Sequence, residues 1–129
     1  MRKGLGISRG IAIGKAFVYE NTPIAYGGLS IAPNDVPREA VVLAEDILPS
    51  DTFTMDKSKV LGFVTLLGSK TSHVAIIASM MGIPAVAGVC TGDVENDVLV
   101  IVDGSEGEVI INPSQPEIEI YSNRSMIRI

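Results

Sequence analysis

The sequence contains no tryptophan, one cysteine (Cys90) and one histidine (His73) in 129 residues. Only three tyrosines and three phenylalanines are present, so valine, isoleucine, leucine and alanine must supply most of the core. A lone cysteine excludes an internal disulfide bond and is typical of a reducing compartment. Because 47% of the residues are apolar, we expect one domain that spans residues 1–129.

Basic residues are also scarce, since ten Lys and Arg stand against fifteen Asp and Glu and give a net charge of −5. Proteins bind nucleic acids and anionic membranes mainly through Lys and Arg, so neither is an expected partner. The longest apolar run, Val74–Val89, is interrupted by Gly82 and Pro84 and is shorter than the about 20 residues of a membrane-spanning helix. The first residues lack the sustained apolar stretch of a secretory signal. These absences predict a soluble, cytoplasmic protein.

The apolar segments are mostly short and rich in β-branched residues, which favours strands. Residues 72–81, in contrast, are apolar around most of a helix circumference, and Gly82 followed by Pro84 is typical of a helix end. A strand, a polar loop, a buried helix and a strand in succession predict a βαβ unit with parallel strands at the centre of an α/β domain. We predict strands at residues 11–19, 41–43, 60–67, 85–89, 98–102 and 107–111.

The remaining segments carry weaker patterns. Residues 21–37 contain three prolines and a Gly-Gly pair, which predict a loop. Ser50 is a candidate N-cap for a short helix. The last segment, residues 115–129, alternates weakly between polar and apolar side chains and predicts either an edge strand or an ordered tail.

His73 ends the polar loop GSKTSH, where the first strand of the βαβ unit meets the helix. Backbone amides at a helix N-terminus lack intrahelical partners and carry partial positive charge, so such ends bind phosphate. Ser69, Thr71 and Ser72 add hydroxyl groups here, and Lys70 adds an ammonium group. The pattern indicates an anion site with a histidine nucleophile.

Other interpretations of the same loop remain open from the residues alone. A single histidine beside an apolar run is often structural. Lys70-Thr71 matches only the end of a nucleotide-binding phosphate loop, because Val64 and Ser69 stand where that motif requires glycine. A metal site would need further histidine or cysteine ligands, and no nucleophile-elbow pattern supports a Ser-His-Asp triad. We therefore predict no metal site.

The stretch GFVTLLGSKTSHVAIIASMMGIPAVAGV resembles the active-site segment of the phosphohistidine domain of phosphoenolpyruvate-utilising enzymes. That segment typically reads Gly-Gly-Arg-Thr-Ser-His, followed by a helix and a Leu- or Ile-Pro-Ala strand. Three further stretches, GISRGIAIGKAFV, VVLAEDILPSDT and VDGSEGEVIINPS, resemble enzyme I of the bacterial sugar phosphotransferase system in the same order. The resemblance implies a three-layer β/β/α swivelling domain with His73 at an exposed loop-to-helix junction.

The same resemblance implies a function and a set of site residues. His73 would be phosphorylated by phosphoenolpyruvate on Nε2 and would pass the phosphoryl group to an HPr-like phosphocarrier protein in sugar transport. Thr65, Lys70, Thr71 and Ser72 are the implied phosphate contacts. The family's helical HPr-docking insertion and its phosphoenolpyruvate-binding barrel, which holds magnesium, have no counterpart in these residues. The domain itself is therefore expected to bind no cofactor and to lack autonomous enzymatic activity.

Four positions depart from the family pattern. Ser69 replaces a loop glycine, Lys70 the loop arginine, Ser79 an arginine after the helix alanine, and Leu66 an acidic residue. Arginine grips phosphate with paired hydrogen bonds that lysine cannot form, and each charge-assisted bond contributes about 1.5–3 kcal/mol. These departures motivate an alternative, a non-catalytic regulatory or binding module that retains the fold. A third possibility outside the family is a structural domain whose apolar helix packs against a partner.

Overall fold

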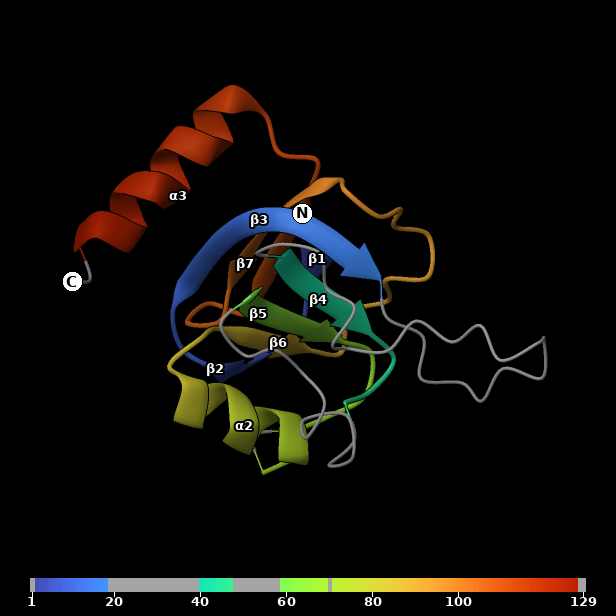
Figure 1. Cartoon of the computed structure of the whole chain (residues 1–129). Coiled ribbons are helices and arrows are strands. Elements are labelled where there is room, and N and C mark those ends of the chain that lie inside the picture. Colours follow the sequence, from blue (N-terminus) through green and yellow to red (C-terminus); the bar gives the residue numbers. More distant parts are fainter. Residues whose placement is uncertain (1, 19–39, 48–58, 70, 128–129) are drawn as a thin grey trace.

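A computed structural model of the chain shows a curled mixed sheet with helices on its outside (Figure 1). The structure describes residues 2–18, 40–47, 59–69 and 71–127, so the loop predicted at 21–37 and the helix predicted after Ser50 lie outside the described residues. The predicted α/β class is confirmed. The strands are β1 (Arg2–Lys3), β2 (Leu5–Ser8), β3 (Ile11–Val18), β4 (Ala40–Ala44), β5 (Val60–Thr65), β6 (Ala85–Ala87), β7 (Leu99–Asp103) and β8 (Glu108–Ile111), and the helices are α2 (His73–Met81) and α3 (Gln115–Ile127).

The strands form one eight-stranded sheet in the order β1-β8-β7-β3-β4-β5-β6-β2. Strands β3, β4, β5 and β6 run parallel to one another, and the other neighbours are antiparallel. Because β1 and β2 occupy opposite ends of this order but are separated in the chain only by Gly4, the sheet must curl until its two edges meet. Strands β5 and β6 are parallel and α2 connects them, which confirms the predicted βαβ unit.

Alternation of side chains along the strands separates the core into layers. On β4, Val41 and Leu43 point into the curl of the sheet, whereas Val42 and Ala44 face α2. The cluster inside the curl also contains Ala16, Val64, Val86, Val89, Val94, Val100, Val102 and Val109. The two halves of the curled sheet and α2 are therefore the three layers of the predicted β/β/α arrangement.

The C-terminal segment, predicted as either an edge strand or an ordered tail, is helix α3, which excludes the edge strand. Glu117 accepts a hydrogen bond from the backbone amide of Ser114 at 2.9 Å, and the Ser114 hydroxyl lies 3.5 Å from the Glu117 amide, so the pair forms a capping box. The hydrogen bond from the Ser114 amide lowers the pKa of the Glu117 carboxyl. Ile118 and Tyr121 pack on Ile101 of β7. Their spacing of three residues, typical of a helix face, was masked by the alternation of residues 117–120.

Strands β1 and β2 were absent from the prediction because each is short and its partner is distant in sequence. Arg2 pairs with Val109, and Leu5 pairs with Ala87. Smaller differences affect element ends. Strand β5 stops at Thr65, two residues earlier than predicted, and β6 stops at Ala87, also two residues earlier.

Neither described helix has the length and apolar character that crossing a membrane requires.

Arg2 anchors β1 to the loop that follows β6. Its guanidinium donates to both carboxylate oxygens of Asp93, at 2.8 and 2.7 Å, and to the carbonyl of Cys90 at 2.6 Å. The hydrogen bonds from Arg2 lower the pKa of the Asp93 carboxyl below its usual value. Asp93 is exposed, so the surrounding water screens this ion pair and limits its contribution to stability.

We predict that the Arg2–Asp93 pair stabilises the fold only while Asp93 is ionised. Since its pKa is lower in the folded chain, the contribution is fully present above about pH 4, the usual carboxyl range, and is lost as pH falls through the lowered folded value. Urea unfolding of the wild-type chain and Asp93→Asn at several pH values measures this. The two free energies of unfolding should converge in acid, and a difference that is constant down to pH 2 would contradict the prediction.

Candidate functional site

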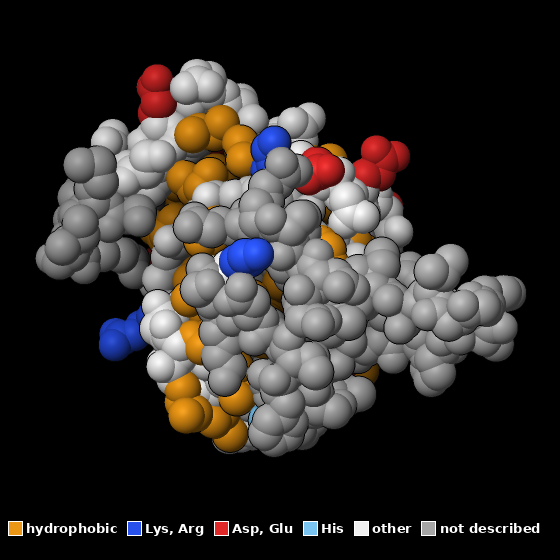
Figure 2. All heavy atoms as spheres, in the orientation of Figure 1, with side chains coloured by type: hydrophobic (Ala, Val, Ile, Leu, Met, Phe, Trp, Pro, Cys, Tyr) orange, Lys and Arg blue, Asp and Glu red, His pale blue; other side chains and the backbone are white. Residues whose placement is uncertain are grey.

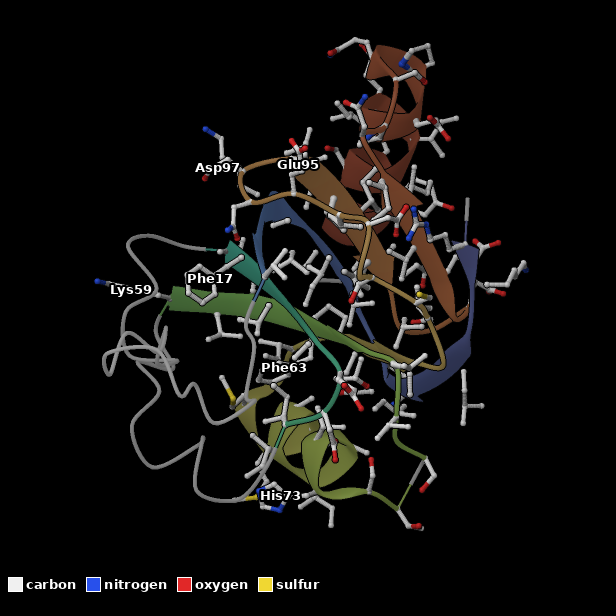
Figure 3. The ribbon with its side chains drawn as sticks, turned by 90° about the vertical axis from the view of Figure 1, so that its right-hand side faces the viewer. Phe17, Lys59, Phe63, His73, Glu95 and Asp97 are labelled. Carbon is white, nitrogen blue, oxygen red and sulfur yellow. The ribbon has the colours of Figure 1, made fainter. Side chains whose placement is uncertain are left out.

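His73 is the first residue of α2 and lies at the end of the molecule opposite Glu95 and Asp97 (Figure 3). The N-cap residue Ser72 has extended backbone angles (φ −70°, ψ 165°), as expected where a loop enters a helix. At the other end Gly82 is left-handed (φ 72°) and its amide donates to the Ser79 carbonyl, which confirms the predicted helix stop.

The path of the loop is set where β5 leaves the sheet. The amides of Leu66 and Leu67 donate to the carbonyls of Ala44 and Glu45 at 3.2 and 2.9 Å. Thr65 is fully buried and its hydroxyl donates to the Leu67 carbonyl at 2.6 Å. Thr65 therefore acts as a brace beneath the loop, and a phosphate contact by the same hydroxyl stays a prediction.

Gly68 turns the chain from this brace toward the helix. Its φ of 133° is unfavourable for residues with a side chain, and an added Cβ would lie 3.3 Å from the Ser72 hydroxyl and 3.4 Å from Ala87. Glycine at this position thus permits the loop to pass close to both α2 and β6.

The hydroxyl groups of the loop are arranged around the helix N-terminus. Ser72 directs its hydroxyl to the carbonyl of Ser69 at 2.7 Å and makes no side-chain cap on its own helix. The hydroxyls of Ser69 and Thr71 lie 3.3 Å apart, on exposed residues. First-turn amides that no side chain caps, beside exposed hydroxyls, are the arrangement that binds anions. Lys70 lies outside the described residues, so its role stays a prediction.

The His73 side chain is less exposed than the sequence predicts. The junction is confirmed, but the residue is half-buried, and Nε2 is buried with no hydrogen-bond partner among the residues that the structure describes. The reason is geometric. Around α2, His73 falls between the buried side of Val74, Ala75 and Ala78 and the exposed side of Ile76. A buried nitrogen without a partner is costly, so Nε2 is a group for which a bound partner would be favourable.

The residue types at this site suit nucleophilic attack and anion binding. A neutral imidazole offers one nitrogen lone pair, and His73 begins a helix that follows a loop with several hydroxyls. Among residues 2–18, 40–47, 59–69 and 71–127, no group of three or more His, Cys, Asp or Glu side chains is placed to hold a metal ion.

Sequence reasoning did not identify part of the support for this loop. The carbonyls of Ala44 and Glu45, and the Val89 amide that donates to the Thr65 carbonyl at 3.1 Å, come from other strands and loops. Backbone groups carry no residue-type signal, so only the folded arrangement identifies them. The Ser69 carbonyl, which accepts from both the amide and the hydroxyl of Ser72, was equally invisible to sequence patterns.

Comparison with known proteins places these features in context. Residues 36–107 match the family described as PEP-utilising enzyme, mobile domain. The phosphoenolpyruvate-protein phosphotransferases of Priestia megaterium and Bacillus subtilis (strain 168) are 46% and 44% identical to this chain over 95 and 94 residues. These alignments cover 72% and 71% of this chain but only 17% and 16% of the relatives. The chain thus spans a small part of the length of the curated relatives it matches.

Solved structures agree with this similarity. An NMR solution structure of Enzyme I has a TM-score of 0.69 and 46% identity, covering 76% of this chain and 40% of that chain. The crystal structure of Thermococcus kodakaraensis aconitase X covers 84% of this chain and 95% of that chain at a TM-score of 0.59. At 21% identity, the latter likeness concerns the fold alone.

We predict that Thr65→Val loosens the loop before His73. Valine nearly matches threonine in shape but removes the hydrogen bond to the Leu67 carbonyl, a loss of about 0.5–1.5 kcal/mol for such a bond. Urea unfolding measures the stability, and the amide NMR shifts of residues 66–74 report the loop. Thr65→Ser is the matched control, because it retains the hydroxyl. Equal stability and unchanged shifts in Thr65→Val would show that the brace is unimportant.

Proposed function

This chain belongs to the mobile-domain family of phosphoenolpyruvate-utilising enzymes, and from that premise we propose that it is a phosphoryl-carrier domain of a phosphotransferase system. His73 accepts the phosphoryl group of phosphoenolpyruvate and passes it to a phosphocarrier protein of the HPr type. The observation that carries the proposal is the position of His73, the only histidine of the chain, as first residue of a helix whose N-terminal amides no side chain caps.

The first transfer is a substitution at phosphorus. The lone pair of Nε2, the nitrogen that the family resemblance indicates, forms the N–P bond. The bond from phosphorus to the bridging oxygen of phosphoenolpyruvate breaks, and that oxygen leaves with its electron pair as the enolate of pyruvate, which takes a proton from solvent. In the second transfer, a nucleophile of the carrier protein attacks phosphorus and the N–P bond breaks.

The residues around His73 bind and orient the transferred group. First-turn amides of α2 provide partial positive charge near the equatorial oxygens, where negative charge lies throughout the transfer. The hydroxyls of Ser69 and Thr71 lie 3.3 Å apart on exposed residues, and rotation of either hydroxyl would let it donate to phosphate instead. The brace at Thr65 and the glycine at position 68 hold the loop in this position.

From the family resemblance, the donor is proposed to be a separate phosphoenolpyruvate-binding barrel domain with magnesium. The N–P bond can form only when Nε2 is accessible. Because Nε2 is buried in this structure, the ring or the residues that cover it must move before transfer. In this proposal the domain acts as a carrier between two partners.

A second candidate function rests on Ser79. This residue is exposed on α2 where the family pattern has an arginine, and the serine removes a cation that could bind phosphate. Together with the buried Nε2, this favours a non-catalytic regulatory or binding module. The two functions differ in whether His73 is phosphorylated.

Labelled phosphoenolpyruvate, magnesium and an added barrel domain test the proposal. We expect a label on the wild-type chain that is labile in acid and stable in alkali, as for a phosphohistidine, and no label on His73→Ala. Circular dichroism and the unfolding midpoint of His73→Ala establish that the variant is folded. An unlabelled wild-type chain, or a label that persists in folded His73→Ala, would favour the regulatory module.

Lys70 generates a separate prediction about the anion site. If its ammonium replaces the family arginine, Lys70→Ala should weaken binding of inorganic phosphate several-fold, and Lys70→Arg should strengthen it through paired hydrogen bonds. Phosphate titrations followed by the amide NMR shifts of Ser69–Val74 measure the affinity. The same affinity in all three chains would remove Lys70 from the site.

A further inference from the structure

Ser72 occupies the N-cap position of α2, yet its side chain does not cap the helix. The first helical hydrogen bond runs from the Ile76 amide to the Ser72 carbonyl at 3.2 Å, so the amides of residues 73–75 precede the helical ladder. A serine at the N-cap usually accepts a hydrogen bond from the amide of the second or third helical residue, which here is Val74 or Ala75. Ser72 forms no such bond.

The Ser72 hydroxyl is engaged instead in the loop that precedes the helix. It donates to the Ser69 carbonyl at 2.7 Å, and the Ser72 amide donates to the same carbonyl at 3.1 Å. Gly68 makes room for this contact, since a Cβ on Gly68 would lie 3.3 Å from the Ser72 hydroxyl oxygen. The two bonds tie the loop to the start of the helix, and we call them the Ser72 latch.

The helix end that the latch leaves uncapped is suited to an anion. Its amides carry partial positive charge, and the first turn of α2 contains no acidic residue. On the face that Figure 2 shows, acidic side chains lie toward the upper end of the molecule, whereas α2 lies at its lower end. Phosphate therefore meets no competing carboxylate from the first turn of this helix.

The His73 ring gives a second, independent indication of a ligand at this end of the helix. Its Nε2 atom is buried and has no hydrogen-bond partner among residues 2–18, 40–47, 59–69 and 71–127. A buried polar atom without a partner is costly, so a group bound there would be favourable.

The latch also prevents a competition for the same amides. If the Ser72 oxygen capped Val74 or Ala75, it would occupy the N–H groups that a phosphoryl oxygen needs. Because the Ser69 carbonyl holds the hydroxyl, those N–H groups stay available, and the loop is ordered before phosphate binds.

We propose that Ser72 is a positioning residue of the phosphoryl site and not a phosphate contact. Its hydroxyl fixes the loop through the Ser69 carbonyl and leaves the amides of Val74 and Ala75 to bind the phosphoryl oxygens. This inference rests on the proposed function and deepens it, because it separates the residue that shapes the site from the groups that touch phosphate. It revises the expectation from the family resemblance, which counts Ser72 among the phosphate contacts.

The experiment compares Ser72→Ala, Ser72→Asn and Ser72→Thr with the wild-type chain. Alanine can neither form the latch nor cap a helix, asparagine is a strong N-cap, and threonine keeps a hydroxyl. Ser79→Ala is the matched control, because Ser79 is an exposed serine of the same helix, about two turns from Ser72.

Three measurements are made on each chain. Inorganic phosphate is titrated against the amide NMR shifts of Val74 and Ala75, which gives the affinity of the site. The carbonyl carbon shift of Ser69, recorded without phosphate, reports the latch. Urea unfolding gives the stability and establishes that each variant is folded.

We expect Ser72→Ala to change the Ser69 carbonyl shift and to weaken phosphate binding about 2- to 10-fold, as for one lost hydrogen bond. Ser72→Thr should restore both. Ser72→Asn should be more stable than Ser72→Ala, because asparagine caps the helix, and yet bind phosphate no more tightly, because the cap occupies the amides. Ser79→Ala should bind phosphate as the wild type does.

Wild-type phosphate affinity in Ser72→Asn overturns the proposal, because it indicates that a donor at position 72 contacts phosphate directly. An unchanged Ser69 carbonyl shift in Ser72→Ala overturns it too, as does a threonine chain that recovers this shift without recovering the affinity. Binding of inorganic phosphate involves no transfer, so these results are independent of the proposed function. A wild-type chain that binds phosphate but takes no phosphoryl group from a phosphoenolpyruvate-loaded barrel domain overturns the proposed function alone.

Discussion

The close crossing of strand β2 and the β7–β8 turn is the constraint on which the remaining structure depends. A Cβ on Gly6 would lie 2.1 Å from the Gly104 carbonyl oxygen, and one on Gly104 would lie 1.8 Å from the carbonyl oxygen of Ser8. Only glycine fits at such distances. These contacts close the curled sheet, place β2 beside β6 and enclose the valine-rich inner cluster. They also give a physical reason for Gly6 in the GISRG stretch and Gly104 in the VDGSEG stretch.

The closed sheet in turn provides a rigid support for a small reactive loop. Strand β5 is paired on both sides, by β4 and β6, so its end at Thr65 has a fixed position. Three kinds of contact continue that rigidity into the loop, namely backbone bonds to the end of β4, the Thr65 brace and the Gly68 turn. For the proposed carrier function such preorganisation is favourable, because less ordering is needed when each complex forms.

The site differs from the family pattern at a few residues, although its scaffold is the same. Ser69 contributes a hydroxyl and a carbonyl to the loop, and Ser79 and Met80 leave the outer side of α2 without a charge. Relative to the family pattern, Ser69 adds hydrogen-bond donors for phosphate, whereas Ser79 removes a cation. In the proposed function, the reactivity of His73 therefore depends on how far neutral donors and helix amides replace arginine.

The sequence by itself determined the elements whose signals are local. Periodicity and the Gly82–Pro84 stop defined α2 to within a residue of its start, and β-branched runs located β3, β4, β5, β7 and β8. The loop motif located His73 at the helix start. Tertiary structure alone decided what depends on distant partners: β1 and β2 exist through pairing with β8 and β6, and the side of α3 that carries Ile118 and Tyr121 packs on Ile101. The Ser114–Glu117 capping box is a local signal for α3 that the alternation of residues 117–120 obscured. The half-buried His73 ring belongs to the same class, because burial is set by neighbours in space and a sequence pattern records only neighbours along the chain.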